Sequence, residues 1–121
     1  AGTNNSNLKN NYSVVKVTVN GEVIDTGLQF MGLIMGDHSK CGINTTFNTG
    51  TNVGINCNLY GSAMHKRHIS SFTWGSDNDD YTTYKLDKAL AVNKTVMSRR
   101  KQNLSKYEEE LLGNIFQLTT G

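Results

Sequence analysis

A run of four basic side chains, His65-Lys66-Arg67-His68, stands in the middle of this sequence. The ammonium group of Lys66 and the guanidinium group of Arg67 suit phosphate groups, because both form charge-assisted hydrogen bonds with phosphate oxygens. We therefore take these two residues as candidates for binding a phosphorylated ligand. The alternative is an ordinary surface patch of solvated charges.

The three histidines, His38, His65 and His68, raise the possibility of a zinc ion held between subunits. His65 and His68 are only three residues apart, in a segment that has no helical pattern. Acidic and glutamine residues that would support such a site do not stand out. We therefore predict that the chain has no metal site, and zinc binding is the alternative.

The elements that place these side chains follow from a repeat of six residues. From Met35 onward the sequence divides into MGDHSK, CGINTT, FNTGTN, VGINCN and LYGSAM. The first position is always apolar, the fifth is always small, and glycine recurs at the second. A helix cannot keep a period of six and a simple strand alternates at two, so the repeat indicates a different architecture.

A chain that turns sharply after every six residues forms triangular coils, which stack at the ~4.8 Å spacing of paired strands. The large apolar residue of each hexad fills the interior, and the small residue lies near a corner. Glycine and asparagine take the turn positions that need a positive φ. The register stacks three pairs: Met35 beneath Val53, Cys41 beneath Leu59, and Ser39 beneath Cys57. The predicted fold is an all-β solenoid, a left-handed parallel β-helix of hexapeptide repeats.

Two further elements are expected on the N-terminal side of the hexads. Residues 13–26 contain two β-branched runs joined by Asn20-Gly21, which is the strongest short signal for a β-hairpin. We expect this hairpin to be inserted into the coil. Residues 4–11 form a polar loop that leads into it. This loop is either simply solvated or part of a site.

The C-terminal third has a helical character. Residues 69–75 read as an extended segment, and apolar residues recur at near-helical spacing from about 83 to 100. Ser105 and Glu108 form a capping box that opens a second helix. We expect a β-helix over residues 1–75 and a helical extension over residues 76–121, with the helices covering the open end of the coil.

Composition limits the classes of partner. The formal net charge is only +2, which gives no general argument for binding nucleic acid or an anionic membrane. The sequence has no apolar run near the ~18 residues that a membrane span needs. Its two cysteines, Cys41 and Cys57, fall in different columns of the repeat, so we expect reduced thiols in a cytoplasmic protein.

Several strings of residues resemble a known enzyme family. Ala1-Gly2-Thr3 with Ser6-Asn7 resembles the A-G-T-x-x-x-N stretch of bifunctional enzymes that acetylate glucosamine-1-phosphate and then uridylylate it. The run from GLIMGDHSK to NLYG, followed by SSFTWG, is still more similar to sugar nucleotidyltransferases with a C-terminal left-handed β-helix. The resemblance implies a homotrimer with active sites between neighbouring coils. It also implies acetyl-CoA as the acyl donor and a sugar phosphate or nucleotide sugar as the substrate.

The resemblance also assigns roles to particular residues. Ala1 and Asn7 fall where the family contacts the thioester end of CoA, and the Asn7 amide can donate to a developing oxyanion. Lys66 and Arg67 are expected to bind the phosphates of CoA or of a nucleotide sugar. Lys9 is a candidate for the phosphate of the sugar substrate. For Asn7 and Lys9 the alternative is a solvated side chain in a polar loop.

The sequence departs from the family in ways that leave two functions open. The family's catalytic histidine lies upstream of its A-G-T, so we expect this chain to be a fragment without it. Leu8 replaces a common tyrosine, and Ile43 and Tyr60 replace small residues near CoA. His38 lies on the predicted exterior, where we favour a subunit interface over catalysis. Acetyl transfer to an amino sugar phosphate is the first reading, and a non-catalytic trimerisation or regulatory module of a nucleotidyltransferase is the alternative.

Overall fold

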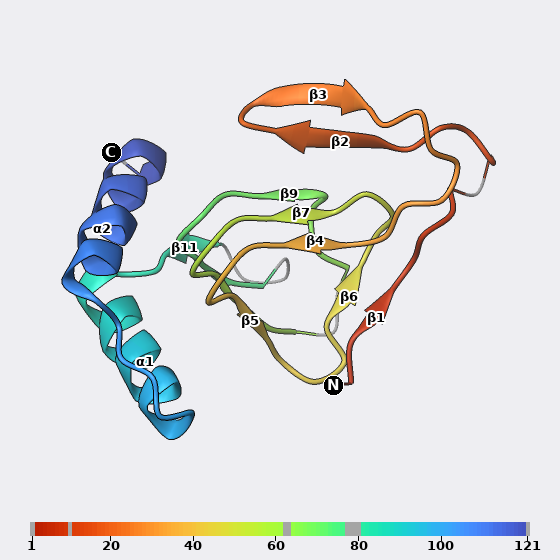
Figure 1. The fold of residues 1–121 in the computed structure, drawn as a ribbon. Coiled ribbons are helices and arrows are strands. Elements are labelled where there is room, and N and C mark those ends of the chain that lie inside the picture. Colours follow the sequence, from red (N-terminus) through yellow and green to blue (C-terminus); the bar gives the residue numbers. More distant parts are fainter. Residues whose placement is uncertain (1, 10, 62–63, 77–80, 121) are drawn as a thin grey trace.

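The computed structural model describes residues 2–9, 11–61, 64–76 and 81–120. Within these ranges the chain forms short strands followed by two helices (Figure 1). The strands are β1 (Asn4–Asn5), β2 (Lys16–Val19), β3 (Glu22–Asp25), β4 (Ile34–Met35), β5 (Lys40–Cys41), β6 (Thr46–Phe47), β7 (Asn52–Val53), β8 (Asn58–Leu59), β9 (His68–Ile69), β10 (Thr73–Gly75) and β11 (Thr82–Thr83). The helices are α1 (Leu86–Arg99) and α2 (Lys106–Thr120).

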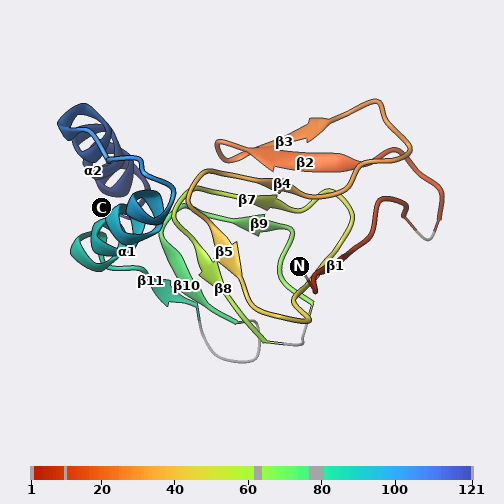
Figure 2. The same cartoon turned by 60° about the horizontal axis from the view of Figure 1, so that its bottom comes forward.

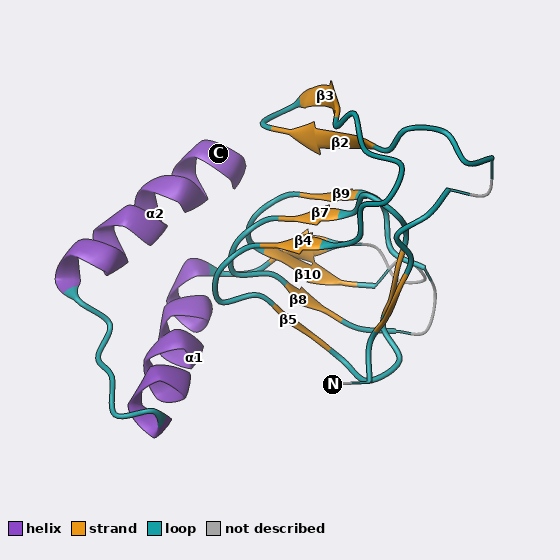
Figure 3. Ribbon diagram, turned by 45° about the vertical axis from the view of Figure 1, so that its right-hand side comes forward, coloured by secondary structure: helices purple, strands orange, loops and turns teal. Residues whose placement is uncertain are grey.

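The short strands stack in parallel in three groups. One group has the order β4-β7-β9 (Figure 3). A second has the order β5-β8-β10, and β11 adds to β10 in the antiparallel direction (Figure 2). In the third, β1 pairs with β6, and a bridge between Thr46 and Met64 extends the stack.

The register within these stacks matches the hexads. Met35 pairs with Val53 and Cys41 pairs with Leu59, so the predicted stacking of these residues is confirmed. Ser39 lies beside Cys57, whose backbone N–H donates to the Ser39 hydroxyl at 3.1 Å. We propose on this ground that the three stacks are the sides of one left-handed parallel β-helix, the fold class that the repeat predicts.

The interior contains the apolar first residue of each hexad. Phe47, Val53 and Leu59 are at most 2% exposed. Met35 and Cys41 pack against this cluster but stay partly exposed, because they belong to the first complete coil. Together with Cys57 and Ile69 these side chains form the first of two hydrophobic clusters. Their burial is the main favourable contribution to the stability of the coil.

The corners depend on the fourth and fifth residues of each hexad. The fourth residue has a positive φ in four successive hexads: His38 (61°), Asn44 (63°), Gly50 (71°) and Asn56 (53°). The fifth residue, where it is threonine, donates its hydroxyl to the carbonyl three residues earlier. This bond is 2.7 Å long at both Thr45 and Thr51, and each of these side chains is fully buried. Small residues are therefore needed there for their size and for this bond.

The predicted hairpin is confirmed by antiparallel pairing of β2 with β3. Asn20 and Gly21 both have a positive φ, as a tight two-residue turn requires. The hairpin packs on the coil, because the Asn52 side-chain amide donates to the Thr18 carbonyl at 2.8 Å. A Cβ atom on Gly50 would lie 2.7 Å from Val15, so glycine allows this close approach.

The helices pack against a corner of the coil (Figure 3). The second cluster joins Phe72 and Tyr84 to Ala89 of α1 and Leu112 of α2, and Ile55 packs against it from the preceding coil. We expected the helices to cover the end of the stack, whereas β11 pairs with the edge of β10 instead. Strand pairing therefore continues beyond residue 75. Residues 82–83 pair with β10 as a strand, so α1 begins only after them, at Leu86.

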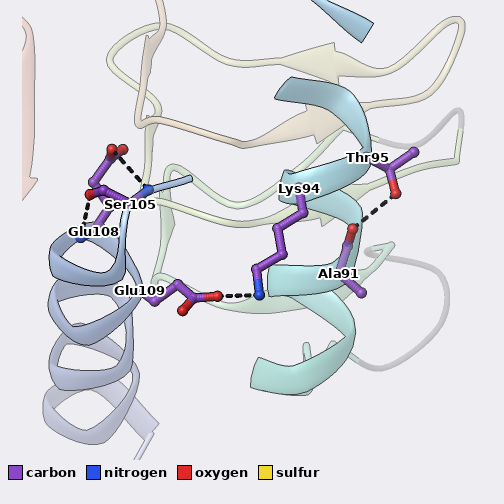
Figure 4. A network of polar contacts seen from close by, with 6 residues as sticks. All are labelled: Ala91, Lys94, Thr95, Ser105, Glu108 and Glu109. Carbon is purple, nitrogen blue, oxygen red and sulfur yellow. Dashed lines mark hydrogen bonds and ion pairs between the residues drawn. The ribbon is translucent and has the colours of Figure 1, made fainter. Parts of the chain in front are cut away.

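Polar contacts fix the two helices locally (Figure 4). The Glu108 backbone N–H donates to the Ser105 hydroxyl at 3.1 Å, and the Ser105 N–H donates to the Glu108 carboxylate at 3.4 Å, which confirms the capping box. Lys94 of α1 forms an ion pair with Glu109 of α2. In the part of the chain that the structure describes, neither helix is long and apolar enough to cross a membrane.

Replacing Val53 with Asp will test the assigned register. Val53 is 2% exposed, so the carboxylate would be buried without a partner, and we expect unfolding to become easier by about 3 kcal/mol. Thermal unfolding followed by circular dichroism measures this change. Val23→Asp is the matched control, because Val23 is 69% exposed on the hairpin. Equal melting temperatures for the two variants would show that the register is wrong.

The buried thiol of Cys57 predicts a pH dependence of stability. Burial raises the pKa of Cys57 above its usual value of 9.0, and the thiol lies 3.2 Å from the Ser70 carbonyl. Above about pH 9 the unfolded chain therefore loses this proton before the folded chain does. The unfolding free energy should then fall by up to about 1.4 kcal/mol per pH unit. Urea unfolding at increasing pH should give a shallower fall for Cys57→Ser, and an unchanged fall would contradict the assignment.

Candidate functional site

A cavity of about 550 Å³ lies where the loop after β1 meets the coil. Three segments that are distant in sequence form its walls: the loop after β1, the turn after β6 and the segment that precedes β9. The lining residues are Ser6, Leu8, Lys9, Asn11, Asn48, Met64 and Arg67. Two of the predicted site residues, Lys9 and Arg67, therefore line the same cavity.

The N-terminal wall is held against the coil by hydrogen bonds. Because β1 pairs with β6, the Ser6 backbone N–H donates to the Phe47 carbonyl at 3.2 Å. The Thr49 hydroxyl, on a side chain that is 1% exposed, lies 2.8 Å from the Ser6 hydroxyl and 3.1 Å from the Leu8 carbonyl. These contacts fix the start of the loop that carries Lys9.

The opposite wall is fixed by the backbone. Met64 bridges to Thr46 in the β1-β6 stack, and the Arg67 carbonyl accepts from the Asn52 N–H at 2.6 Å. The Arg67 backbone is therefore tied to the adjacent coil, while its exposed side chain can reach into the cavity opening.

The charge of the lining has one sign. Among the described residues that line it, Lys9 and Arg67 are the charged ones, and none carries a carboxylate or an imidazole. In the described part of the chain, neither Lys9 nor Arg67 forms an ion pair. The ion pair that the structure shows there joins Lys94 to Glu109, on the two helices. Two cations without a counter-charge attract an anion, so the cavity is suited to binding phosphate rather than to proton abstraction.

Two asparagines of the lining have their donor groups available. The Asn11 side-chain oxygen accepts from the Ser13 N–H at 3.1 Å and from the Ser13 hydroxyl at 2.7 Å. The Asn48 side-chain oxygen accepts from the Thr49 N–H at 2.8 Å. Since both oxygens are occupied locally, both NH₂ groups remain as donors, which again favours an anionic ligand.

Of the two residues expected at the CoA thioester, Asn7 is not part of this lining. Ala1 lies outside the described residues. The Asn7 carbonyl accepts from the Met31 N–H at 2.8 Å, next to the bridge between Leu8 and Phe30, and the side chain of Asn7 is exposed. Asn7 therefore lies at the base of the hairpin excursion, beside the cavity residues Ser6 and Leu8.

Lys66 and Arg67 were predicted to act together, but their side chains lie in different places. The Lys66 ammonium lies 5.2 Å from the centre of the Tyr81 ring, in a smaller hollow of about 150 Å³. Both side chains are exposed, but the chain bends at Arg67 just before β9, so the two side chains do not share one site. Of this pair, Arg67 is the one that lines the larger cavity.

His65 is buried, although it belongs to a run of four basic side chains and was considered as a zinc ligand. It is 3% exposed and stacks on Phe47 with ring centroids 5.5 Å apart. Its Nδ1 lies 2.6 Å from the Tyr81 hydroxyl. His65 thus continues the interior column above Phe47, and Tyr81 packs against the same cluster.

The other two histidines, His38 and His68, do not lie in the interior column that contains His65. His68 is exposed on β9, and the partly exposed His38 occupies a positive-φ corner. The ammonium of Lys40 donates to the His38 carbonyl at 3.3 Å, and burial lowers the pKa of Lys40. Among the residues that the structure describes, no three His, Cys, Asp or Glu side chains converge to hold a metal ion.

Sequence reasoning missed part of the lining. Asn48 and Met64 were not selected, Asn11 entered only as part of the polar loop over residues 4–11, and Ser6 entered only as part of that loop and of a motif. Asparagine is expected at turns for conformational reasons, so its type alone gave no signal of a site. A convergence of three distant segments can be recognised only once the position of the inserted hairpin is known.

No family model matches the chain. It is 35% identical over 69 residues to a bifunctional sugar-1-phosphate nucleotidylyltransferase/acetyltransferase from Sulfurisphaera tokodaii, which covers 57% of this chain and 17% of that protein. It is 33% identical over 81 residues to the bifunctional protein GlmU from Methanocaldococcus jannaschii, which covers 67% of this chain and 20% of that protein. The chain therefore spans about a fifth of the length of these curated relatives.

Proposed function

We propose that this chain is the acyltransferase-like part of a sugar-phosphate nucleotidyltransferase, and that it takes part in acetyl transfer from acetyl-CoA to an amino sugar phosphate. The observation that supports this function most directly is that Lys9 and Arg67 line one cavity whose described lining residues include no carboxylate. The similarity to a protein named for both nucleotidylyl and acetyl transfer points in the same direction.

The cavity offers a consistent way to hold phosphate. The Arg67 guanidinium can donate two parallel hydrogen bonds to phosphate oxygens, and the Lys9 ammonium adds a point charge. The NH₂ groups of Asn11 and Asn48 supply neutral donors. Either the sugar phosphate or a phosphate of CoA meets these requirements, and the binding experiment below separates the two.

The proposed reaction is the attack of the substrate amine on the thioester carbonyl. The C–N bond forms, the C–S bond breaks, the amine loses a proton to a general base, and the CoA thiolate takes up a proton. A donor such as the exposed Asn7 amide would stabilise the oxyanion. None of the described lining residues carries an imidazole or a carboxylate, so the proposed base lies outside these residues.

The same observation favours a second candidate function. A cavity that has binding groups but no general base suits a non-catalytic trimerisation or regulatory module of a nucleotidyltransferase. Ile43 is 81% exposed and Tyr60 is 38% exposed, and both are larger than the residues expected near CoA. Exposed apolar side chains of this kind suit contacts between copies better than they suit a cofactor site.

The first prediction from this proposal concerns assembly. We expect a homotrimer, because a stack of so few coils has a high ratio of surface to volume and association covers one side. Light scattering at micromolar concentration should give three times the chain mass of 13.3 kDa. A mass equal to that of one chain would contradict the proposed assembly.

The second prediction concerns the ligand. Calorimetric titration with acetyl-CoA and, separately, with glucosamine-1-phosphate should show binding of at least one of them. Arg67→Ala and Lys9→Ala should each weaken that binding by about tenfold or more, because each removes a charged donor. Lys66→Ala is the matched control, since its ammonium lies over Tyr81 and outside the cavity.

Turnover then separates the two candidate functions. Release of the CoA thiol that depends on glucosamine-1-phosphate would establish acetyl transfer. Binding without release would favour the regulatory module. Absence of binding by both ligands at millimolar concentration, or equal losses in Lys66→Ala and Arg67→Ala, would contradict the assignment of this cavity.

A further inference from the structure

A second hollow, of about 220 Å³, lies on another part of the surface. It is bounded by β10, β11 and the first turn of α1, and its lining residues are Trp74, Thr82, Thr83, Tyr84, Lys85 and Lys88. It shares no residue with the cavity that contains Lys9 and Arg67. Its combination of a half-exposed tryptophan and two lysines has no role in the function proposed above.

Trp74 is held rigidly at this place. Its backbone pairs with Asn58 on one side and with Thr82 on the other. Its ring packs at 81° to the ring of Tyr84, with centroids 4.9 Å apart, and Tyr84 is itself only 6% exposed. The indole of Trp74 is nevertheless 39% exposed. A fixed and accessible aromatic surface binds a planar ring at little entropic cost.

The two lysines give the hollow a positive charge. Lys85 and Lys88 are exposed, and among the described residues neither forms an ion pair. Both stand at the start of α1, where acidic side chains would stabilise the helix and basic ones oppose its dipole. Asp87 in the same turn supplies the favourable charge but does not line the hollow, so an anion bound between Lys85 and Lys88 would reduce the repulsion between these two lysines.

We propose that this hollow binds a free nucleotide. The base stacks on Trp74, and the phosphate groups lie against Lys85 and Lys88 at the rim. The Thr83 hydroxyl is within the lining and suits a ribose hydroxyl, whereas the Thr82 hydroxyl already donates to the Trp74 carbonyl at 3.2 Å. A single nucleotide fits better than a nucleic-acid strand, because the hollow is small and the formal net charge of the chain is only +2.

Trp74 also provides the measurement, because it is the single tryptophan of the chain. Titration with ADP and with UDP should quench its fluorescence in a saturable way. The double variant Lys85→Ala/Lys88→Ala should weaken the binding by about tenfold or more. The control double variant Lys101→Ala/Lys106→Ala removes two exposed lysines outside the hollow and should leave the affinity unchanged. Arg67→Ala should also leave it unchanged, which separates this site from the first cavity.

Further experiments test the phosphate-binding part and the base-stacking part of the site separately. Adenosine and uridine should bind much more weakly than their diphosphates, and inorganic phosphate should compete with the nucleotides. Trp74→Ala, followed by calorimetry, should lose about tenfold in affinity. No quenching at millimolar nucleotide would overturn the proposal. Equal affinity for nucleoside and nucleotide would overturn it too, as would loss of the response in Arg67→Ala.

Discussion

Three bends of the coil depend on one short hydrogen bond each, from a threonine side chain to the backbone. At Thr45, Thr51 and Thr73 the hydroxyl donates to the carbonyl three residues earlier, at 2.7 Å in each case. These side chains are at most 9% exposed, so water cannot replace the bond and its loss would leave a buried donor. Because the chain is bent at these corners, one large apolar residue from each side reaches the interior. The cluster around Phe47 and Val53 follows from this geometry.

Stability depends on the inward side chains of the stacked segments, and candidate function depends on their outward side chains. Inward residues such as His65 stack on the column below, and outward neighbours such as Arg67 and Trp74 remain available to ligands. Parallel pairing fixes the backbone of both kinds of residue. Backbone pairing therefore positions the outward residues, and their side chains are not needed for packing of the core. This explains how so small a chain can carry several hollows with cations in their linings.

The repeat predicts much of the fold but little of the site. Spacing alone was sufficient for the pairs Met35–Val53 and Cys41–Leu59, because a period of six is compatible with very few arrangements. Burial of His65 could not be anticipated, since it follows the last recognisable hexad and its neighbours are basic. The meeting of Lys9 with Arg67 depends on where the hairpin leaves the coil, and local sequence does not encode that contact.

Contacts between the two chain segments at the base of the inserted hairpin close it off from the coil, in a neck of the chain. This affects which insertions and deletions such a protein can tolerate in evolution. The bridge between Leu8 and Phe30 and the hydrogen bond from the Met31 N–H to the Asn7 carbonyl join the outgoing and returning strands at its base. The register of the strands that precede and follow the hairpin therefore does not depend on the number of residues in the hairpin. Insertions and deletions in the arm would leave the register of the coil intact. Descendants of one ancestor can thus differ widely in this arm while keeping the same stacked parallel strands.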